Sequence, residues 1–303
     1  MRQKTINNSA TCEGVGIHTG ERVALTINPA PANHGIVFIR TDLTSHYRIP
    51  AIWENIKSAL NASTLGVNGT RISTVEHLLA ALAAQGIDNA SVEVDGPEVP
   101  ILDGSAGPFV EMIKRAGVVE LDPPRSWVVI RKPVRVRMNG SFAEIHPSKA
   151  PSISCSIAYD HPSLQYQERT ARLSCAEFES EIANARTYGF LKDVDRLRAM
   201  GLAKGGSLEN AVIFDDSGVV NEEGMRWEDE CVRHKILDLF GDLFLFGRPV
   251  LGEVKAHKPG HALNHMLIRE VLTNPDCYEI VSDPSDLAGM LTPEVMEEHG
   301  IRA

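Results

Sequence analysis

The chain has 303 residues, of which 43% are hydrophobic and 6% aromatic, and its 30 basic and 40 acidic side chains give a formal net charge of −10. This length fits two medium domains or one large one, and it allows a sizeable core. An acidic chain without a basic cluster lacks the Lys and Arg surface that a phosphate backbone needs, so no nucleic acid is expected as a partner.

No apolar run reaches the roughly 18 to 20 residues that span a bilayer, and residues 1–16 lack the apolar stretch of a signal peptide. Five cysteines are scattered without a Cys-x-x-Cys pair, and their odd number argues against a disulfide framework. We therefore expect a cytoplasmic protein with reduced thiols and no integral membrane segment. No heptad repeat or long apolar edge indicates a partner chain, so a monomer is expected.

Short β-branched segments predict strands in both halves of the chain, at 23–27, 35–39, 90–94 and 128–130. Few helices are interleaved with them, which indicates a layered α+β fold. The glycine-rich run 14–20 fits neither a dinucleotide-binding fingerprint nor a P-loop, and it is predicted to be a tight turn between two strands.

The first predicted helix covers about 74–85 and ends at Gly86. Ser73 and Glu76 have the spacing of a capping box, in which Glu76 reaches back to a backbone N–H. The alternative is a catalytic carboxylate beside the neighbouring His77. Because His77 lies off the apolar stripe, it is either a surface residue or a metal ligand.

The second predicted helix covers about 228–246 and carries three polar side chains on one face. At 100° per residue, His234, Asp238 and Asp242 lie within an arc of about 80°, away from the apolar stripe. Imidazole and carboxylate four residues apart can bind one divalent ion. The same spacing is common on solvated helix faces, and taken alone it favours that interpretation.

The surroundings of the two helices predict two halves of similar build. Each helix ends at a glycine and is followed by a strand, at 89–94 and at 250–256. Two prolines within 120–125 predict a boundary between the halves. The resulting division is an N-terminal domain 1–122, a C-terminal domain 126–282 with an insertion at about 193–216, and a polar tail 283–303 that is expected to be poorly ordered.

A third candidate is His261, which follows the loop 258–260 and precedes a predicted helix at 262–272. The positive end of a helix dipole lowers the pKa of a histidine unless a carboxylate such as Asp242 compensates. His261 is therefore either a partly exposed capping residue or an acid/base group with a pKa near neutrality.

With these residues in view, the chain resembles the UDP-3-O-acyl-N-acetylglucosamine deacetylase family, the zinc amidases of early lipid A synthesis. The resemblance is an ordered series of motifs that covers about residues 3 to 275. The motifs are GVGIHTG (14–20), STVEHLLAAL (73–82), GIDNA (86–90), VPILDGSAGPF (99–109), ARTYGF (185–190), HKILDLFGDL (234–243) and KPGHALNH (258–265).

The resemblance implies an α+β fold of two similar two-layer α/β sandwich domains, packed through their helix layers with the active site at the domain interface. It also implies that the insertion is a βαβ element that forms a hydrophobic passage for an acyl chain. The implied reaction is the zinc-dependent hydrolysis of the N-acetyl group of UDP-3-O-(3-hydroxyacyl)-N-acetylglucosamine, the committed step of lipid A biosynthesis.

The resemblance also implies a role for each candidate residue. The metal ligands are His77, His234 and Asp238. Glu76 is the general base, His261 the general acid, Asp242 the carboxylate that holds His261, and Thr187 a hydroxyl at the developing oxyanion. Lys235, Phe190 and His18 contact the substrate, a UDP-linked acylated amino sugar. The expected cofactor is one Zn²⁺, with Fe²⁺ as an alternative for the same ligands.

Four features depart from the family pattern. His265 stands where Asn is usual, Pro259 replaces a small polar residue, and Tyr188 stands where Phe is often found. The segment 62–65 lacks a cysteine that some members carry near the metal. Two other functions stay open: a zinc amidohydrolase that acts on another acylated amino sugar, and a non-catalytic nucleotide-sugar or metal sensor. The pair Glu76 and His261 argues against a sensor, because binding alone needs no acid and base.

Overall fold

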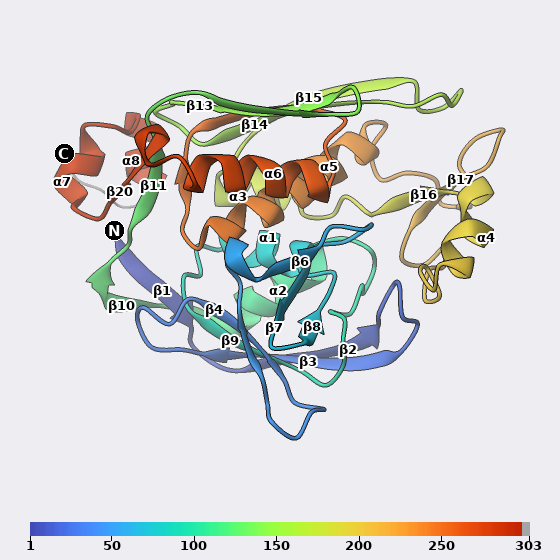
Figure 1. Cartoon of the computed structure of the whole chain (residues 1–303), viewed down its shortest axis with the longest axis horizontal. Helices are drawn as coiled ribbons and strands as arrows, with labels where there is room; N and C mark the ends of the chain where they lie inside the picture. Colours follow the sequence, from blue (N-terminus) through green and yellow to red (C-terminus); the bar gives the residue numbers. More distant parts are fainter. Residues whose placement is uncertain (299–303) are drawn as a thin grey trace.

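Two five-stranded sheets enclose a layer of helices in the computed structural model, which describes residues 1–298 (Figure 1). The first sheet has the order β2 (Ala10–Val15), β3 (Arg22–Pro29), β9 (Ala90–Val94), β4 (Ile36–Arg40) and β5 (Arg48–Pro50). The second has the order β12 (Val134–Met138), β13 (Ser141–His146), β19 (Glu253–His257), β14 (Ser152–Ala158) and β15 (Tyr166–Arg172). The α+β fold class is thereby confirmed.

The two sheets share one topology. When the five strands of each sheet are counted along the chain, the fifth one forms the centre of the sheet. It lies between the second and the third strand. That middle strand is antiparallel to the second strand and parallel to the third, as the pairs β9–β4 and β19–β14 show. This repeat supports the two halves of similar build. The division into domains 1–122 and 126–282 stays a prediction.

The helix layer lies between the sheets, with α1 packed against α2 and α5, and α5 packed against α6. The helices are α1 (Glu76–Ala84), α2 (Gly107–Ala116), α3 (Cys175–Glu177), α4 (Leu191–Ala199), α5 (Glu230–Leu243), α6 (His261–Leu272), α7 (Pro284–Ala288) and α8 (Pro293–Glu298). Short 3₁₀ turns occupy Trp53–Asn55, Phe244–Phe246 and Pro275–Cys277, and a π-turn occupies Phe178–Ile182.

Alternating apolar residues attach each sheet to the helices. On β3 the side chains of Val23, Leu25 and Ile27 are buried while their neighbours are not, and β14 shows the same period of two. Since the buried faces of both sheets point inward, one continuous apolar core runs through the two sheets and the helices between them.

The first helix begins later than predicted, and the capping box is wrong. The backbone of Ser73 pairs with the chain around Pro97, which keeps Ser73 outside the helix. Residue Val75 precedes the first helical turn, and no side chain caps it. The carboxylate of Glu76 therefore does not cap the helix. It accepts a hydrogen bond from the backbone N–H of Ser63 (3.1 Å).

The second helix is buried on nearly all sides, so the interpretation of its polar face as solvated is wrong. It lies between α1, α6 and the sheet strand β14. His234, Asp238 and Asp242 are each at most 3% exposed. Buried ionisable groups in such a place need partners or a ligand, because desolvation of an unpaired charge is costly.

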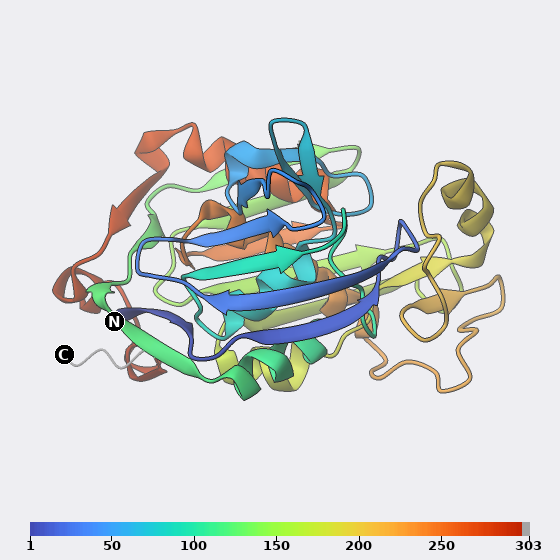
Figure 2. The ribbon, with the colours of Figure 1, turned by 90° about the horizontal axis from the view of Figure 1, so that it is seen from below.

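The insertion projects from one end of the molecule as a small βαβ unit (Figure 2). It consists of the parallel strands β16 (Tyr188–Phe190) and β17 (Val212–Phe214) with α4 between them. The predicted range 193–216 contains most of α4 and all of β17 but omits β16. This first strand is only three residues long, too short for its periodicity to be read.

Three further small sheets complete the fold: β6 (Ile56–Ser58) with β7 (Thr64–Val67) and β8 (Thr70–Ile72), β1 (Arg2–Ile6) with β10 (Val118–Pro124), and β18 (Val250–Leu251) with β11 (Trp127–Ile130) and β20 (Tyr278–Val281). The prolines predicted to form a boundary thus end β10. Within residues 1–298, no helix is long and apolar enough to cross a membrane.

The expectation of a poorly ordered tail is wrong for 283–298, whereas 299–303 lie outside the described residues. Helix α7, helix α8 and the turn between them bury Leu287, Val295 and Leu291 in a second, smaller apolar cluster with Trp127 and Leu251. The polar composition of the tail led to the prediction of disorder, because these three apolar residues are separated by polar ones.

Candidate metal centre and active site

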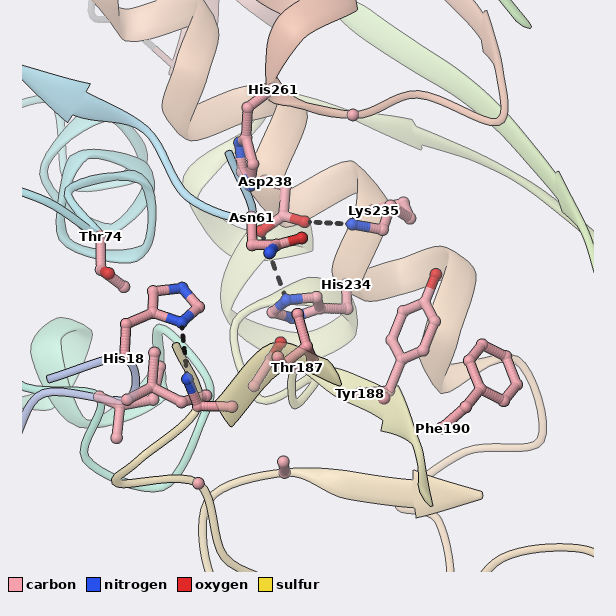
Figure 3. A pocket seen from close by; sticks show the side chains of 18 of the residues that line it. His18, Asn61, Thr74, Thr187, Tyr188, Phe190, His234, Lys235, Asp238 and His261 are labelled. Atoms are coloured by element: carbon pink, nitrogen blue, oxygen red, sulfur yellow. Dashed lines mark hydrogen bonds and ion pairs between the residues drawn. The ribbon is translucent and has the colours of Figure 1, made fainter. Parts of the chain in front are cut away.

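A cavity of about 700 Å³ opens between the helix layer and the insertion. Of the ten residues predicted for the site, all but Asp242 line it; the nine are His18, Glu76, His77, Thr187, Phe190, His234, Lys235, Asp238 and His261. Asp242 is fully buried behind His261. The structure therefore brings together side chains from both halves of the chain and from the insertion (Figure 3).

The three predicted metal ligands converge on one point. Nε2 of His77 and Nε2 of His234 lie 3.5 and 3.3 Å from Oδ1 of Asp238. A tetrahedral ion with ligand bonds of about 2.0–2.1 Å separates its ligand atoms by about 3.3 Å. Two imidazoles and one carboxylate at this spacing fit a divalent cation, and three protein ligands leave a fourth position open.

His234 and Asp238 are held in the form that binds a cation. Nδ1 of His234 donates to the carbonyl oxygen of Ala185 (2.9 Å), which leaves the Nε2 lone pair directed at the site. Burial lowers the pKa of His234 to about 3, so the ring is neutral at pH 7. Burial opposes ionisation of Asp238, but its neighbours, the Lys235 ammonium among them, outweigh burial and hold the pKa of Asp238 well below its usual value.

Lys235 lines the cavity and also binds Asp238, one of the predicted metal ligands. Its Nζ donates to Oδ2 of Asp238 (2.7 Å) and lies 5.6 Å from the ring centroid of Tyr188. Burial disfavours its charge, but Asp238 outweighs burial and raises the pKa of Lys235. The ammonium group is thus a fixed positive charge shared between Asp238 and any anionic group that enters the cavity.

Glu76 and His261 form a second polar pair beside the metal ligands. Oε1 of Glu76 lies 3.4 Å from Nε2 of His261. Burial raises the pKa of Glu76, which makes it a stronger base than an exposed carboxylate. Nδ1 of His261 donates to Oδ2 of Asp242 (2.8 Å), so the other nitrogen of the ring faces the cavity.

The pKa of His261 departs from the near-neutral value expected from sequence. Burial disfavours the imidazolium, but Asp242 and Glu76 outweigh it and raise the pKa of His261 to about 10. The ring is also buried, so the interpretation as a partly exposed capping residue is wrong. Burial and the position at the start of α6 both disfavour a positive charge on this histidine. The two carboxylates outweigh both effects and favour the imidazolium.

The remaining predicted residues line the wall of the cavity (Figure 3). Thr187 is held by its backbone, which donates to Gly104 and accepts from Val212 (2.8 Å each). His18 sits in the predicted turn between β2 and β3, and its Nδ1 accepts a hydrogen bond from the backbone of Ala203 in the insertion (3.4 Å). Phe190 belongs to an aromatic cluster with Tyr159.

The insertion gives the cavity an apolar wall. The wall residues from α4 and the segments after it are Leu191, Val194, Leu197, Leu208, Ile213 and Val220. Such a surface suits a hydrocarbon chain, because burial of each methylene contributes about 0.8 kcal/mol.

Sequence reasoning missed Ser63, which contacts both Glu76 and Asp242. No periodicity or motif marks this residue, since its partner Asp242 lies 179 positions away along the chain. His265 was noted only as a departure, although it follows His261 by one helical turn and shares its face. That i, i+4 spacing is the signal that identifies His265.

The chain is similar to known proteins over most of its length. The family model described as UDP-3-O-acyl N-acetylglycosamine deacetylase (LpxC) matches residues 3–273. A relative from Myxococcus xanthus is 52% identical over 279 residues, which cover 92% of this chain and 89% of the relative. Relatives from Hahella chejuensis (46% over 284 residues; 93% and 94% covered) and Geobacter sp. strain M21 (48% over 279 residues; 92% and 92%) are similar. All three are named UDP-3-O-acyl-N-acetylglucosamine deacetylase.

Proposed function

This chain belongs to the UDP-3-O-acyl N-acetylglycosamine deacetylase family, and from that premise we propose that its buried centre hydrolyses the N-acetyl group of UDP-3-O-(3-hydroxyacyl)-N-acetylglucosamine. The products are acetate and the free 2-amino sugar. The observation that carries the proposal is the convergence of His77, His234 and Asp238 beside the pair Glu76 and His261.

We propose Zn²⁺ as the ion that His77, His234 and Asp238 hold, because neutral imidazole and carboxylate ligands in a four-coordinate site suit it. When bound, Zn²⁺ supplies Lewis-acid chemistry, which polarises an amide carbonyl and favours the deprotonation of water. Fe²⁺ fits the same donor set and is the alternative ion.

The protein's own residues move the protons. Glu76 takes a proton from the water that attacks the acetamide carbon, since burial makes its carboxylate a good base. Thr187 donates a hydrogen bond to the carbonyl oxygen as negative charge develops on it. When the C–N bond breaks, His261 gives a proton to the departing nitrogen, because an unprotonated amide nitrogen is a very poor leaving group. Asp242 keeps His261 charged for this step.

The cavity wall supports an acylated UDP-sugar as the substrate. The apolar residues of the insertion suit the acyl chain, and Lys235, Phe190 and His18 line the space available to the nucleotide sugar. All these residues come from one chain, so we infer that a monomer suffices. Cys12, Cys155, Cys231 and Cys277 form no disulfide within residues 1–298, which is consistent with a reducing, cytoplasmic compartment.

The direct test is acetate release by the zinc-loaded protein. With the UDP-3-O-acyl substrate it should release one acetate per substrate molecule. Glu76→Gln should lower kcat by about 10²- to 10⁴-fold while the protein retains its metal. Glu111→Gln, on the exposed face of α2, is the matched control and should leave kcat unchanged.

Acetate release from a different acylated amino sugar, but not from the UDP-3-O-acyl substrate, would favour the alternative amidohydrolase. Zinc binding without release of acetate from any substrate would favour the non-catalytic sensor.

A further inference from the structure

Ser63 links the two proton-transferring arms of the site. It lies fully buried immediately before β7. Its backbone N–H donates to Oε2 of Glu76 (3.1 Å), and its hydroxyl donates to Oδ1 of Asp242. One residue therefore contacts the proposed base directly. It reaches the proposed acid both through the carboxylate that holds it and through its own Oγ, which lies 3.3 Å from Nδ1 of His261.

His265 completes this contact from α6. Its Nε2 lies 2.8 Å from Oγ of Ser63, and its buried Nδ1 has no hydrogen-bond partner within residues 1–298. The single hydroxyl hydrogen of Ser63 goes to Asp242, because a carboxylate can only accept. His265 must then donate from Nε2 to the Ser63 oxygen. The proton directions of the chain from His265 to Ser63 to Asp242 are thus all determined.

This chain of hydrogen bonds fixes the orientation of the Asp242 carboxylate. Oδ1 is held by Ser63, while Oδ2 accepts from Nδ1 of His261 and from Nδ2 of Asn264 (2.8 Å each). Rotation of the carboxylate would break contacts on both oxygens. The fixed carboxylate in turn fixes the His261 ring, whose Nε2 faces Glu76.

We propose that Ser63 and His265 are positioning residues for this reaction: together they lock Asp242, and Ser63 also holds Glu76, so that the acid and the base keep one mutual geometry. This inference rests on the proposed deacetylase function. It predicts an effect on the chemical step and not on the metal, because neither residue is among the metal ligands.

The kinetic test uses metal-loaded Ser63→Ala and Ser63→Thr. Loss of the hydroxyl should lower kcat by about 10- to 100-fold, since small misplacements of catalytic groups have effects of this size. KM and the metal content should stay within about twofold of the unmodified protein. Ser63→Thr keeps a hydroxyl and should recover most of kcat. His265→Gln, which retains an N–H donor, should likewise retain more activity than His265→Leu.

Thr5→Val is the matched control, because Thr5 is also a buried hydroxyl, accepts a hydrogen bond from Ala30 and lies outside the cavity. It should alter thermal stability without altering kcat. A packing role alone for Ser63 would make Ser63→Ala resemble this control. That result, or a kcat for Ser63→Thr as low as for Ser63→Ala, would overturn the proposal.

An NMR measurement separates this inference from the proposed function. In the metal-free protein, the Nδ1 proton of His261 should give a low-field signal from its hydrogen bond to Asp242. Ser63→Ala should shift or broaden that signal, and Ser63→Thr should restore it. If the protein released no acetate, this response would still support the positioning role, whereas an unchanged signal in Ser63→Ala would overturn it.

Discussion

At the scale of single residues, the site pairs buried carboxylates with cationic side chains. Asp238 faces Lys235, and Asp242 faces His261. In a chain with a net charge of −10, Lys235 and His261 place two cationic groups at the cavity, where an anionic substrate can contact them. At Glu76 the effect of burial exceeds that of the neighbouring histidines, so the pKa of its carboxyl is raised.

The Asp242–His261 pair predicts a change in pH dependence. Asp242→Asn removes the negative charge that most strongly favours the imidazolium, so the pKa of His261 should fall from its raised value of about 10. Because the general acid must be protonated, activity should then be lost at lower pH than in the unmodified protein. The basic limb of the profile of kcat/KM against pH measures this shift.

Asp88→Asn is the control for this experiment, since Asp88 is also a largely buried carboxylate but pairs with Arg125 outside the cavity. It should leave the basic limb in place. A basic limb that Asp242→Asn does not move would show that His261 is not the acid.

The sequence identifies the candidate site where the spacing is local. His234 and Asp238 share a helix face at i, i+4, and this alone made them candidate ligands. His77 could be joined to them only through the family resemblance, because it lies on another helix. Ser63 could not be found, since its function depends on contacts across 179 positions of the chain.

At the scale of elements, the close crossing of α1 and α5 brings the proposed metal ligands together. Gly241 makes this approach possible, because a Cβ at this position would overlap the carbonyl oxygen of Glu76. Glu76 and His77 therefore sit against the helix that carries His234 and Asp238. A prediction from helix periodicity alone gives the faces of α1 and α5 but not their separation.

We predict that Gly241→Ala separates α1 from α5. The substitution should lower the free energy of unfolding by about 1–3 kcal/mol through overpacking. It should also lower kcat and the affinity for the metal, since the ligands come from both helices. Urea unfolding and metal titration measure these effects.

Gly289→Ala is the matched control: the added Cβ would lie 3.7 Å from the backbone of Asp286, an ordinary contact. It should leave kcat and metal affinity unchanged. Equal effects of the two substitutions would contradict the role given to the crossing.

At the scale of the whole molecule, one strand order occurs twice. The α+β class and the strands 23–27, 90–94 and 128–130 could be predicted from β-branched periodicity. The capping box could not be excluded from sequence, because the backbone pairing of Ser73 with a distant segment decides it. The folded tail was missed for a related reason: a few apolar anchors, spaced by polar residues, are enough to dock it.

The C-terminal helices should contribute stability and not catalysis. Leu287 is fully buried in the small cluster around Trp127, remote from the cavity. Leu287→Ala should lower the free energy of unfolding by about 2 kcal/mol or more, with kcat of the folded protein unchanged. Val118→Ala, at an exposed position of β10, should change stability much less. A fall in kcat at temperatures where the variant is folded would contradict this separation.

The central claim is that one ion, held by His77, His234 and Asp238, makes this chain an amidohydrolase. Titration of the metal-free protein with Zn²⁺, with acetate release from the UDP-3-O-acyl substrate as the readout, tests it most directly. Activity should rise to a limit at one equivalent of bound metal, and His234→Ala should abolish both the binding and the activity. Full acetate release by the metal-free protein, or by His234→Ala, would contradict the account.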